Sequence, residues 1–301
     1  MTLQQLRQVL TLAESNSMNE AAKKLFVSQP NLSATVREVE EELGITVFMR
    51  NNRGITVTAE GEEFLGYAKQ VVEQYHLLEN RYLNVESKKK FSVSMQHYSF
   101  AVKAFVQLAK EVGMDEYEFA VHETKTKEVI DNVKNLKSEI GVLYLSDFNE
   151  KVLRKLFKEC DIEFKELFTC NTYVYLWKKH PLAGKKVITL DDLQEYPCLT
   201  FEQGVNNSFY YAEEMMSTYE YKRVIKADDR ATMLNLMVGL NGFTLCSGII
   251  SEDLNGDDYA AIPLKESEKM HIGYIKHKGT KLSKLGEIYI DALKNYENKV
   301  L

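Results

Sequence analysis

The sequence predicts a mixed α/β protein, and three patterns along the chain carry that prediction. Residues 1–58 combine helix-type periodicity with a short ribbon of β-branched residues. From residue 64 onward, apolar residues recur at spacings of four and three over about three heptads, as in a coiled-coil helix. From residue 91, strand-like and helix-like segments alternate, which indicates βαβ units and a mainly parallel sheet.

The composition is that of a soluble globular protein. The chain has 301 residues, of which 45% are hydrophobic and 27% charged, enough for about two domains with ordinary cores. No apolar run approaches the roughly 18–20 residues of a membrane span, and the start MTLQQLRQVL lacks the basic and apolar regions of a signal peptide. We therefore expect a cytoplasmic protein with no membrane partner.

Motifs for enzyme chemistry are missing from the sequence. There is no GxSxG, no GxGxxG after a strand, no P-loop and no HExxH. The six histidines are dispersed, which does not suggest a metal site, and nothing indicates a cofactor. The cysteines are Cys160, Cys170, Cys198 and Cys246. They are far apart and fit reduced thiols, with redox sensing by Cys198 or Cys246 as the alternative.

The N-terminal part has the start and stop signals of a helix-turn-helix. The S-x-x-E pattern that begins at Ser17 is a capping box and opens one helix. Ser28 can cap the next helix, whose first turn tolerates Pro30 because proline lacks an N–H, and Gly44 stops that helix. β-branched residues on both sides of a turn at 51–54 then predict a two-stranded ribbon. Together these elements predict a winged helix.

The first turn of the helix after Ser28 is the expected base-reading surface. Gln29 can bond adenine N6 and N7, and the Pro30 ring or Ser33 can lie against a thymine methyl. Arg37 can reach guanine or phosphate, or instead pair with Glu41 one turn on. Serine caps suit phosphate oxygens, with a purely structural cap as the alternative. The candidate DNA contacts, the last two on the wing, are Ser17, Ser28, Gln29, Pro30, Asn31, Ser33, Arg37, Arg50 and Arg53.

The charges restrict how this part can bind DNA. The formal net charge of the chain is −6, so any nucleic-acid site must be local. Residues 1–58 hold six basic and six acidic side chains, and glutamates gather toward the end of the recognition helix. The first half of that helix and the wing therefore form the expected DNA face. One copy should bind weakly, and a dimer would double the contacts and read two half-sites.

The heptad-like stretch predicts a dimerisation helix. Its apolar residues are Phe64, Ala68, Val71, Tyr75, Leu78, Tyr82 and Val85. A lone exposed helix of this kind needs a partner to cover its seam, although folding back on its own core is the alternative. The charged stretch ESKKK at 86–90 lacks apolar residues and is typical of a linker.

The alternating part falls into two groups of segments. The first group has strands expected at 91–95, 117–123 and 139–145, and helices at 100–112 and 126–136. The second group begins near Phe164, with strand-like stretches at 168–179, 198–201, 221–227 and 242–248 and helices near 208–219 and 229–240. The strand at 271–278 and the helix at 283–298 are expected to return to the first group.

Three stretches resemble the LysR-type transcriptional regulators, over essentially the whole chain. They are AAKKLFVSQPNLS, VEEELGITVFMR followed by GITVTAEGEEF, and HPLAGKKVITLDDLQEYPCL. The resemblance implies a winged helix-turn-helix DNA-binding domain (1–58), a linker dimerisation helix and hinge (59–90) and a two-lobed, periplasmic-binding-protein-like α/β effector domain (91–301). Lobe I would hold about 91–162 and 265–301, and lobe II about 163–264.

The chain departs from the family pattern at three places. Val39 stands where a leucine is usual, Asn241-Gly242-Phe243 replaces a glycine-rich turn, and SEIGVLYL replaces a common Leu-Asp strand. A narrower likeness rests on MQHYSF, SEIGVLYL, YYAEEM and DRAT, which are similar to the sulfur-amino-acid regulators of low-GC Gram-positive bacteria. That likeness implies a sulfur-amino-acid precursor as effector, such as an O-acylated serine.

The resemblance also implies an effector cleft between the lobes, where strands end and helix N-termini offer free N–H groups. A polar, carboxylate-bearing small molecule would suit the candidate residues. These are Gln96, His97, Tyr98, Ser99, Thr124, Thr126, Thr200, Phe201, Arg230, Thr232 and Ser247. A structural histidine is the alternative for His97, and helix caps are the alternative for Thr126 and Thr232. Arg230 could instead pair with a neighbouring aspartate, Asp228 or Asp229.

The implied partners follow from the family. They are double-stranded DNA carrying an interrupted palindrome, a second copy joined through the linker helix, a further dimer to make a homotetramer, and RNA polymerase if the protein activates. The alternative classes are a cytosolic α/β enzyme and a solute-binding protein acting on a small polar acid. A duplex-binding assay separates the regulator from both.

Overall fold

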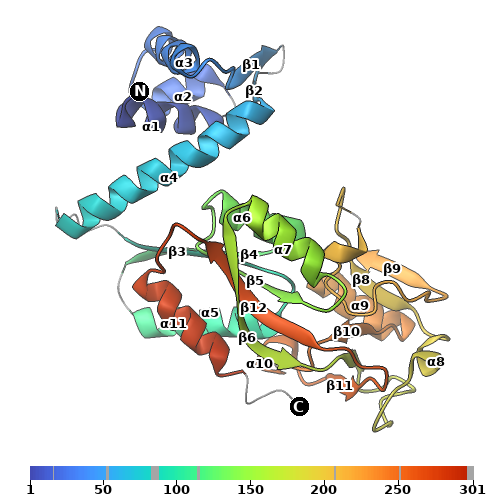
Figure 1. The fold of residues 1–301 in the computed structure, drawn as a ribbon. Helices are drawn as coiled ribbons and strands as arrows, with labels where there is room; N and C mark the ends of the chain where they lie inside the picture. The colour runs from blue at the N-terminus through green and yellow to red at the C-terminus, as the bar shows by residue number, and fades with distance from the viewer. Residues whose placement is uncertain are drawn as a thin grey trace. The chain divides into compact units, whose positions relative to one another are not determined.

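The chain folds into two compact units, Met1–Ser87 and Lys88–Leu301 (Figure 1). This computed structural model describes residues 1–15, 17–51, 54–82, 88–113, 116–206, 208–250 and 252–296. No helix within those ranges is long and apolar enough to cross a membrane. The first unit is mainly helical with one small ribbon, and the second is α/β.

Three short helices pack together in the first unit. They are α1 (Leu3–Ala13), α2 (Met18–Lys24) and α3 (Gln29–Leu43). The Ser28 hydroxyl accepts the Asn31 N–H at 3.3 Å, and Gly44 ends α3 with a left-handed φ of 70°. Val36 and Val39 of α3 lie in one buried cluster with residues of α1 and α2. The start and stop signals expected for the helix-turn-helix are confirmed.

The wing is held against α3 by one glutamate. Strands β1 (Phe48–Asn51) and β2 (Gly54–Val57) pair in antiparallel register. The Glu40 carboxylate of α3 accepts the backbone N–H groups of Val47 and Phe48 at 2.7 and 3.0 Å. These bonds fix where the ribbon leaves the recognition helix.

The first turns of the long helix α4 (Ala59–Tyr82) pack on this core, and Arg7 of α1 contacts the helix further along, at Tyr75 and Glu79. Phe64 lies against the helical cluster and Ala68 is buried. Further along, the side chains of Val71, Tyr75 and Leu78 are 51%, 39% and 55% exposed. The first half of the apolar seam expected from the sequence is therefore covered by the unit's own core, as in the alternative of folding back, whereas Val71, Tyr75 and Leu78 leave its second half exposed in a single copy of the chain. The side chain of Tyr82 and all of Val85 lie outside the described residues.

The larger sheet of the second unit defines lobe I. Its strand order is β4 (Tyr117–Glu123), β3 (Lys89–Met95), β5 (Ile140–Leu145), β12 (Met270–His277) and β6 (Ile162–Cys170). β3 pairs in parallel with β4 and β5, and β12 runs antiparallel to β5 and β6. β12 enters the sheet from the far end of the chain, as expected for the segment at 271–278.

Helices cover both faces of this sheet (Figure 1). They are α5 (Ser99–Val112), α6 (Thr126–Lys134), α7 (Glu150–Glu159) and α11 (Lys284–Lys294). Phe100 of α5 and Tyr289 of α11 lie in one buried cluster, and Ile130 of α6 and Phe157 of α7 lie in another. The carboxyl ends of β3 and β4 lead directly into α5 and α6, which start at the edge facing lobe II.

Lobe II contains the remaining strands. β7 (Tyr173–Trp177) lies between β10 (Thr244–Cys246) and β11 (Tyr259–Pro263), and β8 (Cys198–Phe201) pairs in parallel with β9 (Val224–Ala227). A bridge between Cys198 and Phe243 connects the two groups. Its helices are α8 (Leu190–Leu193), α9 (Arg230–Leu240) and α10 (Glu252–Asn255), with a single 3₁₀ turn, η1 (Phe209–Tyr211).

Four expectations from the sequence are wrong. The sheets are mixed and not mainly parallel, because β12 runs antiparallel to β5 and β6, and β7 runs antiparallel to both of its neighbours. Lys89 and Lys90, placed in the linker, begin β3, because their backbones pair with Tyr117 and Glu118 while their side chains stay exposed. Residues 163–170, placed in lobe II, belong to β6 in the lobe I sheet. The helix near 208–219 is only the η1 turn, because this segment inserts buried polar side chains between the lobes.

Candidate functional site

The first turn of α3 presents polar side chains around its capped N-terminus. Ser28, Pro30 and Asn31 are exposed, and Gln29 and Ser33 are half-buried. Ser17 caps α2 by accepting the Glu20 N–H at 3.2 Å. Free backbone N–H groups and short polar side chains at a helix start suit both phosphate and base edges.

Among the arginines expected at DNA, Arg37 is exposed and forms no ion pair with Glu41 or with any other described carboxylate. The alternative of an intrahelical salt bridge is therefore wrong. The Arg50 side chain and all of Arg53 lie outside the described residues.

The glutamates at the end of α3 serve the fold of the first unit. Glu38 accepts the Gln5 side-chain amide at 2.9 Å, and Glu42 pairs with the N-terminal ammonium. Glu40 holds the wing, as described above. These acids thus gather away from the first turn, which remains the part of α3 suited to a polyanion.

A cavity that is partly open to solvent lies between lobe I and lobe II. Six of the residues expected at an effector line it: His97, Tyr98, Ser99, Phe201, Arg230 and Ser247. Five expected residues do not line it: Gln96, Thr124, Thr126, Thr200 and Thr232. The structure therefore brings together only part of the expected site.

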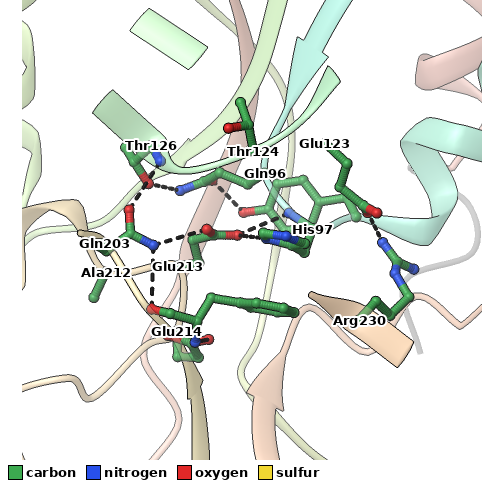
Figure 2. A network of polar contacts seen from close by, with 12 residues as sticks. Gln96, His97, Glu123, Thr124, Thr126, Gln203, Ala212, Glu213, Glu214 and Arg230 are labelled. Atoms are coloured by element: carbon green, nitrogen blue, oxygen red, sulfur yellow. Dashed lines mark hydrogen bonds and ion pairs between the residues drawn. The ribbon is translucent and has the colours of Figure 1, made fainter. Parts of the chain in front are cut away.

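Gln96 and Thr126 are instead joined to each other in a buried network (Figure 2). The Gln96 amide donates to the Thr126 hydroxyl at 2.6 Å, and that hydroxyl donates to the Tyr211 carbonyl at 2.7 Å. The Thr126 backbone N–H donates to Oε1 of Gln203 at 3.0 Å. Lobe II thus supplies hydrogen-bond acceptors to the first turn of α6. Thr126 is the first residue of this helix and not its N-cap, which is Lys125.

Glu213 makes the second contact of this network between the lobes. Its Oε2 accepts the His97 backbone N–H at 2.9 Å and lies 2.8 Å from the ring Nδ1. Its Oε1 accepts the Gln203 amide at 2.9 Å. The His97 ring stacks on Phe201 with 3.7 Å between centroids. His97 is therefore a structural, hydrogen-bonded histidine that also faces the cavity.

Arg230 closes the other side of the cleft (Figure 2). Its guanidinium pairs with Glu123 at the end of β4, so the alternative of an ion pair holds, but with Glu123 in place of Asp228 or Asp229. Asp228 pairs with Lys125 of lobe I at 3.3 Å. Asp229 caps α9 by accepting the N–H of Thr232. Thr232 is exposed, donates its hydroxyl to Asp229 and does not line the cavity.

Thr124 and Thr200 also have local roles. Thr124 donates its hydroxyl to Glu128 and its N–H to the Met95 carbonyl, and it lines a separate polar hollow beside β4. Thr200 lies in β8, paired with Lys226. Neither threonine reaches the cavity between the lobes.

Burial controls protonation around the cavity. Burial and the neighbouring Glu213 carboxylate raise the pKa of Glu214 to about 8. Burial also raises the pKa of Cys246 to about 12 and holds the pKa of Cys198 far above its ordinary value. Both thiols therefore stay protonated, whereas reactive sensor cysteines are thiolates. All four cysteines are free, and the described residues include no cluster of potential metal ligands.

Several cavity residues were missed from the sequence. They are Gln203, Glu213 and Glu214, which build the network or line the cavity, and the apolar lining of Tyr175, Met233, Met237 and Ile249. The paired glutamates in YYAEEM were the only available signal, and they fell on a segment expected to be helical. A helix would have placed them on a solvated face.

Comparison with known proteins supports the same organisation. A family model described as "Bacterial regulatory helix-turn-helix protein, lysR family" matches residues 3–62, and one described as "LysR substrate binding domain" matches residues 114–297. The HTH-type transcriptional regulator CysL of Bacillus subtilis is 25% identical over 308 residues, with 98% of each chain covered. The regulator BsdA of the same organism is 26% identical over 247 residues, with 79% of this chain and 80% of that one covered.

A solved structure shares the fold. Full-length OxyR from Pseudomonas aeruginosa, in a variant form, superposes with a TM-score of 0.67 at 20% identity, covering 98% of both chains. The relatives are named transcriptional regulators, and the second family model covers more than half of the chain. The chain therefore belongs to the lysR family: it is a DNA-binding transcriptional regulator with an effector-binding domain, not an enzyme.

Proposed function

We propose that this regulator reads DNA through the first turn of α3 and senses a small molecule in the cavity between its two lobes. The observation that carries the proposal is that one cavity is lined from both lobes, by His97 to Phe100 on one side and by Phe201, Arg230 and Ser247 on the other. A ligand touching both lobes binds best to one relative arrangement of them, which couples occupancy to conformation.

For the DNA half, the proposal assigns base reading to Gln29 and Arg37. Phosphate contacts fall to Ser17, Ser28 and the wing arginines. The capped, exposed first turn of α3 supports this assignment. Since residues 1–58 carry balanced charge, affinity must come from several copies acting together. The exposed second half of the α4 seam supports a homodimer, and two such dimers would span an interrupted palindrome.

For the effector, we propose a small amino-acid-like molecule of sulfur assimilation, such as an O-acylated serine. The sequence likeness to sulfur-amino-acid regulators supports it, as does a relative named CysL that matches nearly end to end. The cavity supplies both polar and apolar lining for a molecule of that size. If binding of the effector makes the protein activate transcription, RNA polymerase is also a partner.

Two measurements on the full chain test the proposal. Binding to a duplex from the promoter of its own gene, against a scrambled duplex, decides the DNA-reading role. Thermal melting with a panel of sulfur-containing and acylated amino acids decides the sensing role, because a ligand at a hundredfold excess over Kd stabilises by roughly 2.7 kcal/mol. Ser247→Phe fills the cavity and is expected to abolish any such shift. Equal affinity for both duplexes would contradict the first role.

A further inference from the structure

The cavity between the lobes holds a buried carboxyl group that pairs with no cation among the described residues. Glu214 is 5% exposed and lines the cavity. Its Oε1 accepts the Phe201 N–H at 2.8 Å, and no described lysine, arginine or histidine forms an ion pair with it. The two basic side chains that line the cavity are engaged elsewhere, His97 with Glu213 and Arg230 with Glu123. The free cavity therefore has an unmatched acidic wall.

A second buried group in the same wall lacks a partner. The Thr244 side chain lines the cavity and the residue is 7% exposed. No described residue bonds its hydroxyl oxygen, which is itself out of contact with bulk solvent. Leaving a buried hydroxyl unpaired costs free energy, so such groups usually have a partner. The cavity wall therefore holds a second polar group without a partner among the described residues.

The first turn of α5 offers the opposite polarity. The backbone N–H groups of Ser99 and Phe100 face no described acceptor, and both residues line the cavity. The first N–H groups of a helix are unpaired within it and carry its positive end. By contrast, the N–H groups of His97 and Thr126 are already taken by Glu213 and Gln203. A ligand carboxylate therefore finds its donors at α5 rather than at α6.

Resting on the proposed sensing role of this cavity, we propose that its ligand is a small zwitterion such as a free amino acid. Its ammonium lies against Glu214 and its carboxylate lies at the first turn of α5. The apolar lining of Met233, Met237 and Ile249 receives the side chain. A ligand with carboxylates alone would face the like charge of Glu213 and would bring no cation to Glu214, which disfavours it.

The protonation state of Glu214 gives a second way to test this assignment. Its pKa is raised to about 8 by burial and by Glu213, so the carboxyl carries a proton at pH 7 in the free cavity. A ligand ammonium stabilises the charged carboxylate and lowers that pKa. Binding then sends the Glu214 proton to solvent. The other titratable side chains that interact with Glu214 are Glu213, Tyr98, Tyr144, Tyr221 and Cys198. Burial raises the pKa of the tyrosines and of the thiol, so these groups keep their protons. His97 also lines the cavity, paired with Glu213.

The test uses the full chain and matched pairs of probes: O-acetyl-L-serine and L-methionine, each beside its N-acetyl form, which lacks the ammonium. We expect the free amino acids to raise Tm and the N-acetyl forms to bind at least about tenfold more weakly, the effect of one lost charge contact. Glu214→Gln keeps an acceptor for the Phe201 N–H and should cost the free forms a similar factor. Glu202→Gln, outside the cavity lining, should leave affinity unchanged.

Calorimetry in buffers of different ionisation enthalpy counts the protons exchanged. We expect the wild-type chain to release close to one proton per bound amino acid at pH 7. This measurement uses the wild-type chain alone, so it does not depend on whether the variants fold. The assignment is overturned if the N-acetyl forms bind as tightly, or if Glu214→Gln binds the free forms unchanged, or if no proton is released. It is also overturned if no free amino acid binds, whereas the proposed DNA-reading role is decided separately by the promoter duplex.

Discussion

The Glu213 carboxylate of lobe II accepts the backbone N–H of His97 of lobe I at 2.9 Å. Both side chains are almost fully buried, at 4% and 6% exposed. Since water cannot replace a lost partner there, removal of either group leaves the other unpaired. Together with the contact between Gln203 and Thr126, this bond holds the lobes together at the edge of the cavity.

Glu213→Ala should therefore destabilise the second unit. The variant leaves the His97 N–H and the Gln203 amide without their acceptor, at a cost of about 1–3 kcal/mol. Thermal melting should show a Tm lower by several degrees. Glu202→Ala is the matched control, because its side chain makes no described bond. An equal Tm for the two variants would mean that the bonds of Glu213 to His97 and Gln203 contribute nothing to stability.

The parts of the fold that depend on neighbouring residues were predictable from the sequence. Ser28, Pro30 and Gly44 act within one helix, so their pattern alone gives its start and its end. The spacing of Val71, Tyr75 and Leu78 likewise shows which side of α4 is apolar. Local chemistry determines these features, whatever the rest of the chain does.

The contacts between the lobes could not be predicted in this way. Glu213 meets His97 across 116 positions, and β6 pairs with β12 across about a hundred, so no local pattern records either contact. The chain around Glu213 has helix-like composition, yet the burial of its carboxylate between the lobes overrides that local preference. Thr126 was expected at the effector, but it lies in the hydrogen bonds between the lobes and not in the cavity lining.

Gln29→Ala should relax sequence preference. A glutamine that bonds adenine in the major groove contributes about 1–3 kcal/mol of discrimination, which random DNA does not require. Fluorescence anisotropy should show a large loss on the promoter duplex and little change on the scrambled one. Gln4→Ala, at an exposed position of α1, serves as control. Equal losses on the two duplexes would rule out base reading by Gln29.

Placing acids on the α4 seam should dissociate the dimer. In Val71→Asp with Leu78→Asp, carboxylates would be buried against like charges of the partner without compensation. We expect sedimentation at the monomer mass and a collapse of affinity for the promoter duplex. Gln70→Asp adds an acid beside the seam and should keep the parental mass. A double variant that still sediments as a dimer would show that another surface joins the copies.

The contribution of Glu214 to stability should fall as pH rises toward 8. Its folded pKa, about 8, lies above the ordinary value of 4.5, so the group contributes stability that is full below pH 4.5 and lost as pH rises through 8. Each pKa unit corresponds to about 1.36 kcal/mol.

Glu214→Gln removes this titration but keeps the hydrogen-bond acceptor for Phe201. Burial also raises the pKa of Glu139, and because that group titrates in both proteins its effect cancels in their difference. Unfolding by guanidinium should therefore give similar stabilities near pH 4.5 and a growing advantage for the variant toward pH 9. Parallel profiles would show that Glu214 is already ionised at neutral pH, which would also remove the proton release expected on binding an ammonium.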